Sequence, residues 1–308
     1  MSGAPQLAQV SPFRLFEVET LRTQRLSPTF QRITMTGPEL GEFADNGFDQ
    51  RIKLVLPLPG VGFHHLSRGD DWYQHWRTLP GHLRNPIRTY TVRAIRRDAG
   101  EIDVDFALHD DGGPASRWAA AARPGDRLVI VGPNAAYSGF HGGLDFLPHP
   151  ETRRILLAGD ETAVPAIASI LESLPADASG EVLLEVPHTA DALTLARPHR
   201  MRVTWLGRDG VAHGDRLGPA LRDTAAGFFG GSGGRTPGQP VDDVDVDGDL
   251  LWEVPDYASA ARGLYAWLAG EAGVIKTLRR HLVTDLGIDR RGIAFMGYWR
   301  IGRSEPTD

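Results

Sequence analysis

The chain has 308 residues, of which 41% are hydrophobic and 23% charged, and its net charge is −6. This length is typical of two domains, and the acidic balance argues against a protein that binds nucleic acid through phosphates. The absence of cysteine excludes disulfides, thiolate-bound zinc, iron–sulfur clusters and thiol catalysis. Any redox chemistry must therefore use an organic cofactor or a metal held without thiolates.

Two features of the sequence bear on where the protein works. Residues 1–10 lack a basic start followed by an apolar run, so we expect no secretory signal. No stretch is long and apolar enough to cross a bilayer. We therefore expect a cytoplasmic protein without a membrane span.

Short strands dominate the first half of the chain. Partial alternation of apolar and β-branched residues predicts strands at 13–20, 30–35, 50–56, 88–95, 101–108 and 127–131. A helix predicted at 115–122 precedes the last of them. Six short strands with one helix are typical of a small antiparallel β-barrel.

Residues 60–86 interrupt this pattern. They show no periodicity and predict a long loop, and loops of this length are often functional. The segment contains four histidines without a recognisable ligand spacing, so we expect exposed or hydrogen-bonded histidines rather than a metal site: His64, His65, His75 and His82.

After about residue 150, strands alternate with helices. Apolar strands are predicted at 154–158, 181–186, 201–206, 264–268 and 292–299, with helices at 164–174 and 272–286. This alternation predicts an α/β domain with a parallel sheet. We expect domains at 1–148 and 149–308, the second with a flexible Gly- and Asp-rich excursion at 227–248.

Arg88-Thr89-Tyr90-Thr91 mixes a cation, an aromatic ring and two hydroxyls in a strand. Alternation puts Arg88 and Tyr90 on one face and the threonines on the other. Arginine can grip a phosphate with two hydrogen bonds, and tyrosine offers a ring for stacking. These residues suit a ligand that is part phosphate and part flat heterocycle; by themselves they also suit an ordinary edge strand.

Two further segments carry nucleotide-type signals. The run from His109 to Ser116 brings two glycines to a helix start, where unpaired N–H groups favour an anion. Residues 158–166 have the strand, Gly loop and helix order of a nucleotide site, but they lack the three-glycine fingerprint. The first segment is equally compatible with a plain capped helix start. The second is a weak signal by itself, because its acids at the helix start would balance the helix dipole without any ligand.

The order of these motifs resembles one family. Arg-x-Tyr-Thr at 88–91, Gly-Pro-Ala-Ser at 113–116 and Gly-Asp-Glu-Thr-Ala at 159–163 are followed by Trp-Leu-Ala-Gly-Glu at 267–271 and Gly-Tyr-Trp-Arg at 297–300. Together they resemble the siderophore-interacting proteins, which are flavin-dependent ferric-siderophore reductases of the ferredoxin–NADP reductase superfamily. The resemblance implies an N-terminal FAD-binding barrel and a C-terminal NAD(P)H-binding domain.

It also implies roles for individual residues. Arg88 would bind the FAD pyrophosphate, Tyr90 would pack on the flavin or ribityl chain, and Thr91 would hydrogen-bond near flavin N5. The remaining FAD contacts would come from the loop and helix start after the fifth predicted strand: His109, Asp111, Gly113, Ala115 and Ser116.

The second half would bind NAD(P)H through residues of the glycine loop and two later motifs: Gly159, Asp160, Glu161, Thr162, Ala163, Glu271 and Trp299, the last of them beside the flavin. The family pattern Phe-Asp-x-x-Ile-Lys at 48–53 marks Lys53 as the best substrate-side cation, with Arg300 and Arg303 as weaker candidates. The sequence leaves NADH and NADPH open, because a 2′-phosphate pocket depends on where Arg197, Arg202 and Arg208 point.

The implied reaction passes a hydride from NAD(P)H to FAD and then single electrons to ferric iron. No catalytic acid or base and no resident metal are expected. Three alternatives remain at this stage: a general NAD(P)H–flavin reductase, a flavin-bearing siderophore carrier, and a reductase that receives its electrons from ferredoxin.

Overall fold

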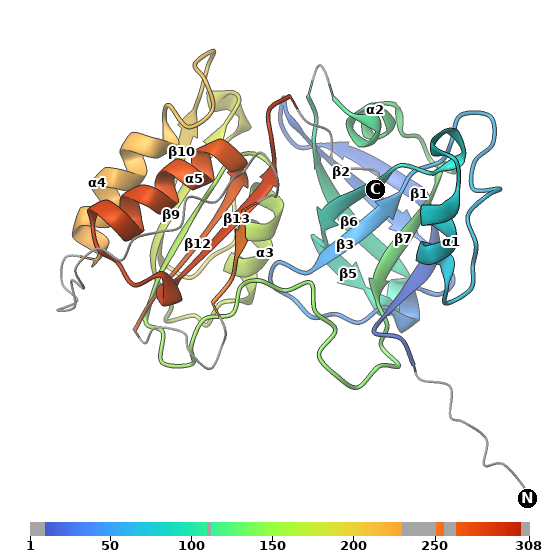
Figure 1. Ribbon diagram of the computed structural model, residues 1–308, viewed down its shortest axis with the longest axis horizontal. Coiled ribbons are helices and arrows are strands. Elements are labelled where there is room, and N and C mark those ends of the chain that lie inside the picture. Colours follow the sequence, from blue (N-terminus) through green and yellow to red (C-terminus); the bar gives the residue numbers. More distant parts are fainter. Residues whose placement is uncertain (1–9, 110–111, 230–250, 256–262, 303–308) are drawn as a thin grey trace, which may run out of the picture.

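The computed structural model describes residues 10–109, 112–229, 251–255 and 263–302. Two β-sheets lie side by side along the long axis of the molecule, and each has helices of its own (Figure 1). The candidates Asp111 and Arg303 lie outside the described residues, as does most of the excursion predicted at 227–248.

The first sheet has seven antiparallel strands in the order β4-β3-β7-β1-β2-β6-β5. Its inward residues form one buried cluster that includes Phe16, Ile33, Leu54 and Phe106, each 0% exposed. The sheet therefore curls around its own core as a half-barrel. Its strands are β1 (Phe13–Arg25), β2 (Phe30–Thr36), β3 (Arg51–Val55), β4 (Ile87–Thr91), β5 (Ala94–Arg96), β6 (Glu101–Ala107) and β7 (Arg127–Pro133).

The prediction of six strands was wrong by one, because the strand expected at 88–95 is divided. β4 pairs with β3 at one edge of the sheet, whereas β5 pairs with β6 at the other edge. The backbone N–H of Val92 donates to Gln50, and that of the next residue, Arg93, donates to Asp103. The chain thus turns a barrel corner between two consecutive residues, and β-propensity alone does not mark such a corner.

The long loop predicted at 60–86 contains a helix, α1 (Trp72–Thr78). Trp76 is 3% exposed, and its indole Nε1 donates to the carbonyl of Asn85 at 2.9 Å. The Asn85 side-chain amide in turn donates to the carbonyls of Leu56 and Gly62. The hydrogen bonds of Trp76 and Asn85 therefore hold this segment against the end of β3. The second helix, α2 (Pro114–Ala121), packs on β2 and β6.

The second sheet has six strands in the order β10-β9-β8-β12-β13-β11. One helix, α3 (Val164–Ser173), packs on one face, while α4 (Leu217–Phe229) and α5 (Ala272–Arg280) pack on the other. The apolar residues of the central strands are therefore buried on both faces. The strands are β8 (Arg154–Gly159), β9 (Ser179–Val186), β10 (Arg200–Gly207), β11 (Trp252–Glu253), β12 (Leu264–Glu271) and β13 (Ile293–Trp299).

The expectation of a wholly parallel sheet was also wrong in detail. Five strands are parallel, but β11 runs antiparallel to β13 at the edge, so the sheet is mixed. A strand of two residues has no periodicity to detect. The helix expected at 272–286 divides too: α5 ends at Arg280, and a π-helical turn, His281–Asp285, follows it.

Polar contacts join the two sheets. Asp191, which is 0% exposed, accepts hydrogen bonds from the Ser27 hydroxyl at 2.6 Å and from both the backbone N–H and the hydroxyl of Thr29 at 2.7 Å. Elsewhere Arg93 forms a two-pronged ion pair with Glu172 of α3, at 2.6 and 2.8 Å. The two halves therefore meet through specific buried polar partners as well as through apolar packing.

Within the described parts of the chain, no helix combines the length and the apolar character that a bilayer crossing requires.

Candidate functional site

The strand β4 presents its motif on two faces, as expected. Arg88 and Tyr90 lie opposite Leu54 and Ile52 of β3, which point into the barrel core. The Tyr90 ring packs on Phe106, with the ring centroids 4.5 Å apart. One face of the motif is therefore anchored in the barrel.

The other face of β4 carries the two threonines. Thr91 is 6% exposed, and the hydroxyl of Thr89 accepts a hydrogen bond from Lys53 Nζ at 2.6 Å. Arg88 and Lys53 thus lie on opposite faces of the same strand pair. The structure separates the cation proposed for phosphate from the cation proposed for the substrate.

The segment before α2 closes on itself. Ser116 Oγ accepts a hydrogen bond from the backbone N–H of His109 at 3.0 Å. A Cβ on Gly112 would lie 2.4 Å from the Ser116 side chain, so this turn requires glycine. Gly113, the residue before the helix, has no atom within 4 Å of its own Cβ position and leaves the helix start open. Ala115 contributes its side chain to the barrel core, so only its backbone could contact a ligand.

The acids of the loop after β8 contact protein partners. Asp160, 3% exposed, accepts hydrogen bonds from the backbone N–H of Thr162 at 2.9 Å, the backbone N–H of Glu271 at 2.7 Å and the indole of Trp299 at 2.8 Å. Burial and the neighbouring Glu161 carboxylate raise the pKa of Asp160 to about 6. The side-chain carboxylate of Asp160 therefore links the C-terminal ends of β8, β12 and β13.

Glu161 is 0% exposed and forms a two-pronged ion pair with Arg208 at 2.7 and 3.0 Å. Its carboxylate also lies 3.3 Å from His213 Nε2 and 3.9 Å from His109 Nδ1. Burial raises the pKa of Glu161, but the hydrogen bonds from His213 and Arg208 outweigh burial and bring that pKa down to about 2. The same hydrogen bond from His213 to Glu161 raises the pKa of the histidine.

Glycine allows this loop to pack so tightly. A Cβ on Gly159 would come within 2.5 Å of both the Ala163 side chain and the Ala269 carbonyl. Gly270, with φ +153°, would bring a Cβ within 2.7 Å of the Asp160 carboxylate. Glu271 then caps α5 by accepting from Val274 N–H at 2.9 Å. The candidate residues of the second sheet therefore pack together at the C-terminal ends of its parallel strands.

Trp299 is where the two halves of the candidate site meet. Its ring lies 4.9 Å from the ring of His213 and 6.3 Å from that of His109, which comes from the first half of the chain. His109, Glu161 and Trp299 were predicted from separate motifs, and the structure brings them together. Arg300 follows Trp299 and is half-buried.

Sequence reasoning did not assign two members of this cluster. The sequence marks Arg208 only as a candidate for a 2′-phosphate, and it does not mark His213. The signal that points to Arg208 is the buried Glu161: a carboxylate at the end of an apolar strand needs a cation nearby.

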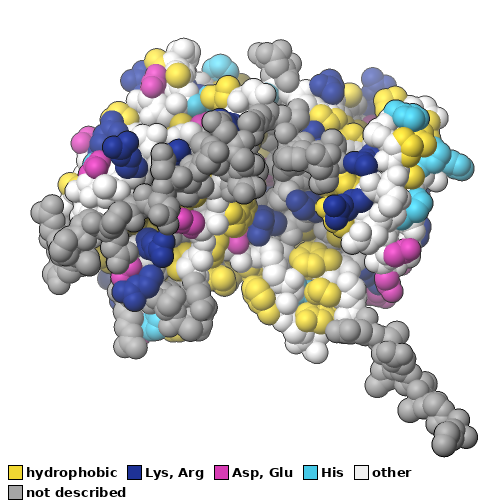
Figure 2. Space-filling view, in the orientation of Figure 1, with side chains coloured by type: hydrophobic (Ala, Val, Ile, Leu, Met, Phe, Trp, Pro, Cys, Tyr) yellow, Lys and Arg dark blue, Asp and Glu magenta, His cyan; other side chains and the backbone are white. Residues whose placement is uncertain are grey.

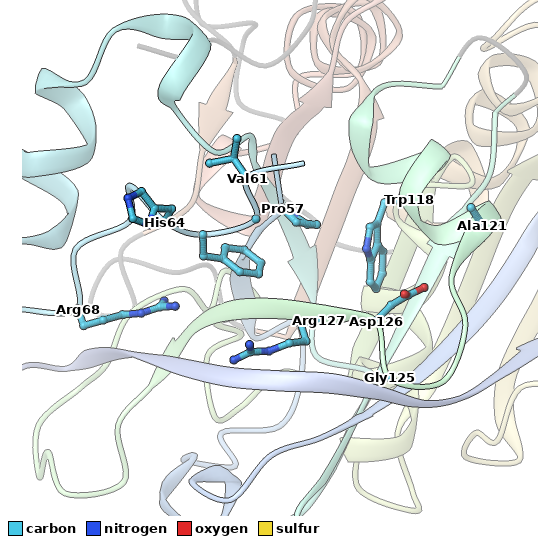
Figure 3. A pocket seen from close by; sticks show the side chains of 11 residues that line it. Pro57, Val61, His64, Arg68, Trp118, Ala121, Gly125, Asp126 and Arg127 are labelled. Carbon is cyan, nitrogen blue, oxygen red and sulfur yellow. The ribbon is translucent and has the colours of Figure 1, made fainter. Parts of the chain in front are cut away.

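A cavity lies away from this cluster, at the barrel end where β3 stops and β7 begins. It measures about 720 Å³, and Figure 3 shows Trp118 of α2 facing the segment 57–68 across it. None of the predicted site residues that the structure describes lines it. The lining is Pro57, Val61, Gly62, Phe63, His64, Arg68, Trp118, Ala121, Gly125, Asp126 and Arg127.

The described residues contain no cluster of three or more His, Asp or Glu side chains placed to hold a metal ion.

Two family models match the chain. One, described as a siderophore-interacting FAD-binding domain, matches residues 19–137, and the other, described as siderophore-interacting protein, matches residues 152–302. These two ranges correspond to the two sheets.

Curated relatives match over nearly the full length. The ferric vibriobactin reductase ViuB of Vibrio cholerae is 30% identical over 290 residues, which are 94% of this chain and 91% of that protein. The NADPH-dependent ferric-chelate reductase of Escherichia coli is 27% identical over 306 residues, which are 97% of this chain and 99% of that protein.

Solved structures agree. A siderophore utilization protein from T. fusca is 30% identical with a TM-score of 0.71, and the match covers 97% of each chain. A ferredoxin NADP+ reductase from Neisseria gonorrhoeae, 14% identical with a TM-score of 0.53, shares the two-sheet fold over 93% of this chain and 99% of that one.

Proposed function

This chain belongs to the siderophore-interacting protein family, and from that membership we propose that it is an FAD-containing oxidoreductase that takes electrons from NAD(P)H and reduces ferric siderophores, releasing ferrous iron. The V. cholerae relative is named for reducing ferric vibriobactin and the E. coli relative for NADPH-dependent ferric-chelate reduction. Both names describe the same type of redox reaction.

The observation that carries the proposal is the meeting of His109 with Glu161 and Trp299. This contact joins a loop of the FAD-binding half to the C-terminal ends of the parallel strands in the second sheet. Nucleotides bind at these strand ends in α/β sheets of this kind. A hydride donor and a flavin must meet at such a boundary between two binding units. The chemistry that bound FAD supplies is the conversion of one hydride into single electrons.

The residues present fit FAD. Arg88 offers a guanidinium for the pyrophosphate, and the open helix start at Gly113 offers backbone N–H groups to the same anion. Tyr90, backed by Phe106, offers a rigid ring beside the ribityl chain or flavin, and Thr91 offers its hydroxyl near the redox-active edge. Further contacts in this proposal come from His109, Ala115 and Ser116, and from Asp111, whose structure is not described.

For NAD(P)H we propose the carboxyl edge of the second sheet. Because the side chains of Asp160 and Glu161 contact protein partners, they would shape the loop, while backbone groups of Gly159, Thr162 and Ala163 face the nucleotide. Glu271 would lie toward the nicotinamide end and Trp299 beside the flavin.

A ferric siderophore is the substrate, and we propose that Lys53, Arg300 and Arg303 attract it. Figure 2 shows Lys and Arg side chains spread over the viewed face of both halves. Cations close to the flavin would favour an anionic complex even though the net charge is −6.

The FAD-binding unit would be residues 1–148 and the NAD(P)H-binding unit 149–308, because β7 ends at Pro133 and β8 begins at Arg154.

The enzyme would work in the cytoplasm, where NAD(P)H is available. Ferredoxin is the alternative electron donor.

One experiment separates this function from its alternatives. Purified protein should be yellow from bound FAD, and anaerobic NADPH or NADH should bleach the flavin. Adding a ferric siderophore with a ferrous chelator should then yield ferrous iron faster than free FAD at equal concentration. Absence of flavin would refute the proposal. Flavin that bleaches with NAD(P)H but yields iron no faster than free FAD would favour a carrier, and bleaching only by reduced ferredoxin would favour the other donor.

A further inference from the structure

The three arginines that could have formed a 2′-phosphate pocket are turned to other partners. Arg208 is buried against Glu161, and Arg197 donates to the backbone carbonyls of Met201 and Leu195. Arg202 is near the start of β10, at the opposite end of the strand from the nucleotide edge. A phosphate on the adenosine ribose would have to find another cation.

A different pair occupies the nucleotide edge. The carboxylate of Asp209, just after β10, accepts hydrogen bonds from the backbone N–H of Thr189 at 3.0 Å and from its hydroxyl at 2.6 Å. Thr189 follows β9, so the pair bridges the carboxyl ends of two adjacent parallel strands. The bridge is tight: a Cβ on Gly207 would lie 2.4 Å from the Thr189 hydroxyl.

The topology places an adenosine ribose near this pair. With β8 as the first strand, the parallel strands follow the order 3-2-1-4-5, the doubly wound arrangement. In such sheets the pyrophosphate lies at the helix after the first strand, and the ribose lies toward the ends of the neighbouring strands. Here those are the ends of β9 and β10, where Thr189 and Asp209 meet.

We propose that Asp209, held in place by Thr189, makes this enzyme prefer NADH to NADPH. The inference rests on the proposed function and specifies its hydride donor. A carboxylate accepts hydrogen bonds from the free 2′-hydroxyl of NADH, whereas it repels the 2′-phosphate of NADPH. The E. coli relative is named for NADPH, so a preference for NADH would distinguish this chain from that relative.

The charges around Asp209 determine what its removal should do. Arg216 and His188 lie close enough to lower the pKa of Asp209, after the larger effect of the Thr189 hydrogen bonds. Arg216 is exposed. Once the carboxylate is gone, Arg216 can face a 2′-phosphate. The substitution Asp209→Asn should therefore admit NADPH, and it preserves an acceptor for Thr189. Asparagine also tolerates the positive φ of 47° at this position.

The test compares kcat/KM for NADH and NADPH in flavin reduction. The unaltered enzyme should favour NADH about tenfold or more, which corresponds to about 1.4 kcal/mol. Asp209→Asn should raise kcat/KM for NADPH about tenfold or more, and the double variant Asp209→Asn/Arg216→Ala should lose that gain. The control Asp215→Asn removes a nearby exposed carboxylate that caps Ala212 N–H and should leave the ratio unchanged.

Binding provides a readout that needs no turnover. Calorimetric titration with 5′-AMP and with 2′,5′-ADP should show that the wild-type protein binds 5′-AMP more tightly and that Asp209→Asn reverses the order. A wild-type preference for NADPH, or an Asp209→Asn variant with an unchanged ratio and unchanged binding order, would overturn the inference. If neither coenzyme reduces the flavin, the proposed donor is wrong, and the titrations still decide whether Asp209 excludes a 2′-phosphate.

Discussion

The carboxylate of Asp160 accepts a hydrogen bond of 2.8 Å from the indole Nε1 of Trp299, which fixes the last residue of β13 against the loop after β8. The ring that would lie beside the flavin is thus oriented by an acid from the nucleotide loop. Two elements that are 139 residues apart in the chain share one contact.

This contact should be measurable as a coupling energy. In a double-mutant cycle, Asp160→Ala and Trp299→Phe should each destabilise the protein, and their effects should fall short of additivity by about 1–2 kcal/mol, because either change removes the same hydrogen bond. Urea unfolding of the four proteins gives the value. Strict additivity would mean that the hydrogen bond contributes nothing to stability.

The ion pair of Glu161 with Arg208 should be far more important for stability than an exposed one. Glu161→Gln removes the nearer of the two acids around the buried Arg208, leaves only Glu185 at 3.5 Å, and should cost about 3 kcal/mol of unfolding free energy. The matched control is Glu181→Gln, whose partner Arg202 is 79% exposed and 3.9 Å away, and which should change stability by less than about 0.5 kcal/mol. Urea unfolding gives the loss of unfolding free energy in each variant. Similar losses in the two variants would contradict the prediction that the buried ion pair contributes more to stability than the exposed one.

The two faces of the β3–β4 pair should separate cofactor binding from substrate binding. Arg88→Ala should lose most of its bound FAD, because the pyrophosphate loses its guanidinium partner. Lys53→Ala should retain FAD and raise KM for an anionic ferric siderophore about tenfold. Flavin absorbance per protein and steady-state kinetics give the two quantities.

A control for that comparison is Arg127→Ala, which removes a barrel cation that is 62% exposed and should affect neither quantity. Full FAD occupancy in the Arg88→Ala variant would rule out the proposed pyrophosphate contact.

The stability of the protein should fall as pH rises from about 4 to about 6. Burial raises the pKa of Asp49 to about 6, from about 3.9 in an unfolded chain. The folded state therefore binds more protons in this window, so deprotonation favours unfolding, by up to about 3 kcal/mol for this one group. The pKa of Asp160 is raised to about 6 as well and adds a slope of the same sign. Asp49→Asn should flatten the profile measured by urea unfolding; a variant with the wild-type slope would exclude Asp49 as a source.

The sequence was sufficient to predict the main architecture, because strand alternation and continuous apolar runs report burial directly. It did not reveal that residues 88–95 turn a barrel corner, since β-branched residues favour both arms of the turn equally. It also missed β11, which has only two residues. The half-barrel with an α/β sheet was thus predictable, while the strand count and the mixed character of the second sheet were not.

The candidate site was predictable in its members more than in their contacts. Motif order identified Arg88, Asp160, Glu161 and Trp299, but spacing says nothing about which side chains meet. Arg208 illustrates the difference, because its position after β10 suited a phosphate ligand, whereas its guanidinium is bound to Glu161. Partner choice in a buried cluster depends on three-dimensional geometry that the linear pattern does not contain.

The hydrogen bonds between Asp191 and residues 27–29 limit how the two halves of this enzyme can be combined with those of a relative. Three of the four hydrogen bonds to Asp191 come from Ser27 and Thr29, which precede the acid by more than 160 residues, and the fourth comes from the backbone N–H of His188. A chimera that joined this C-terminal half to the barrel of a relative without Ser27 and Thr29 would bury an acid with too few donors. The two halves are therefore not interchangeable building blocks: a graft must transfer the turn at 27–29 together with the sheet that depends on it.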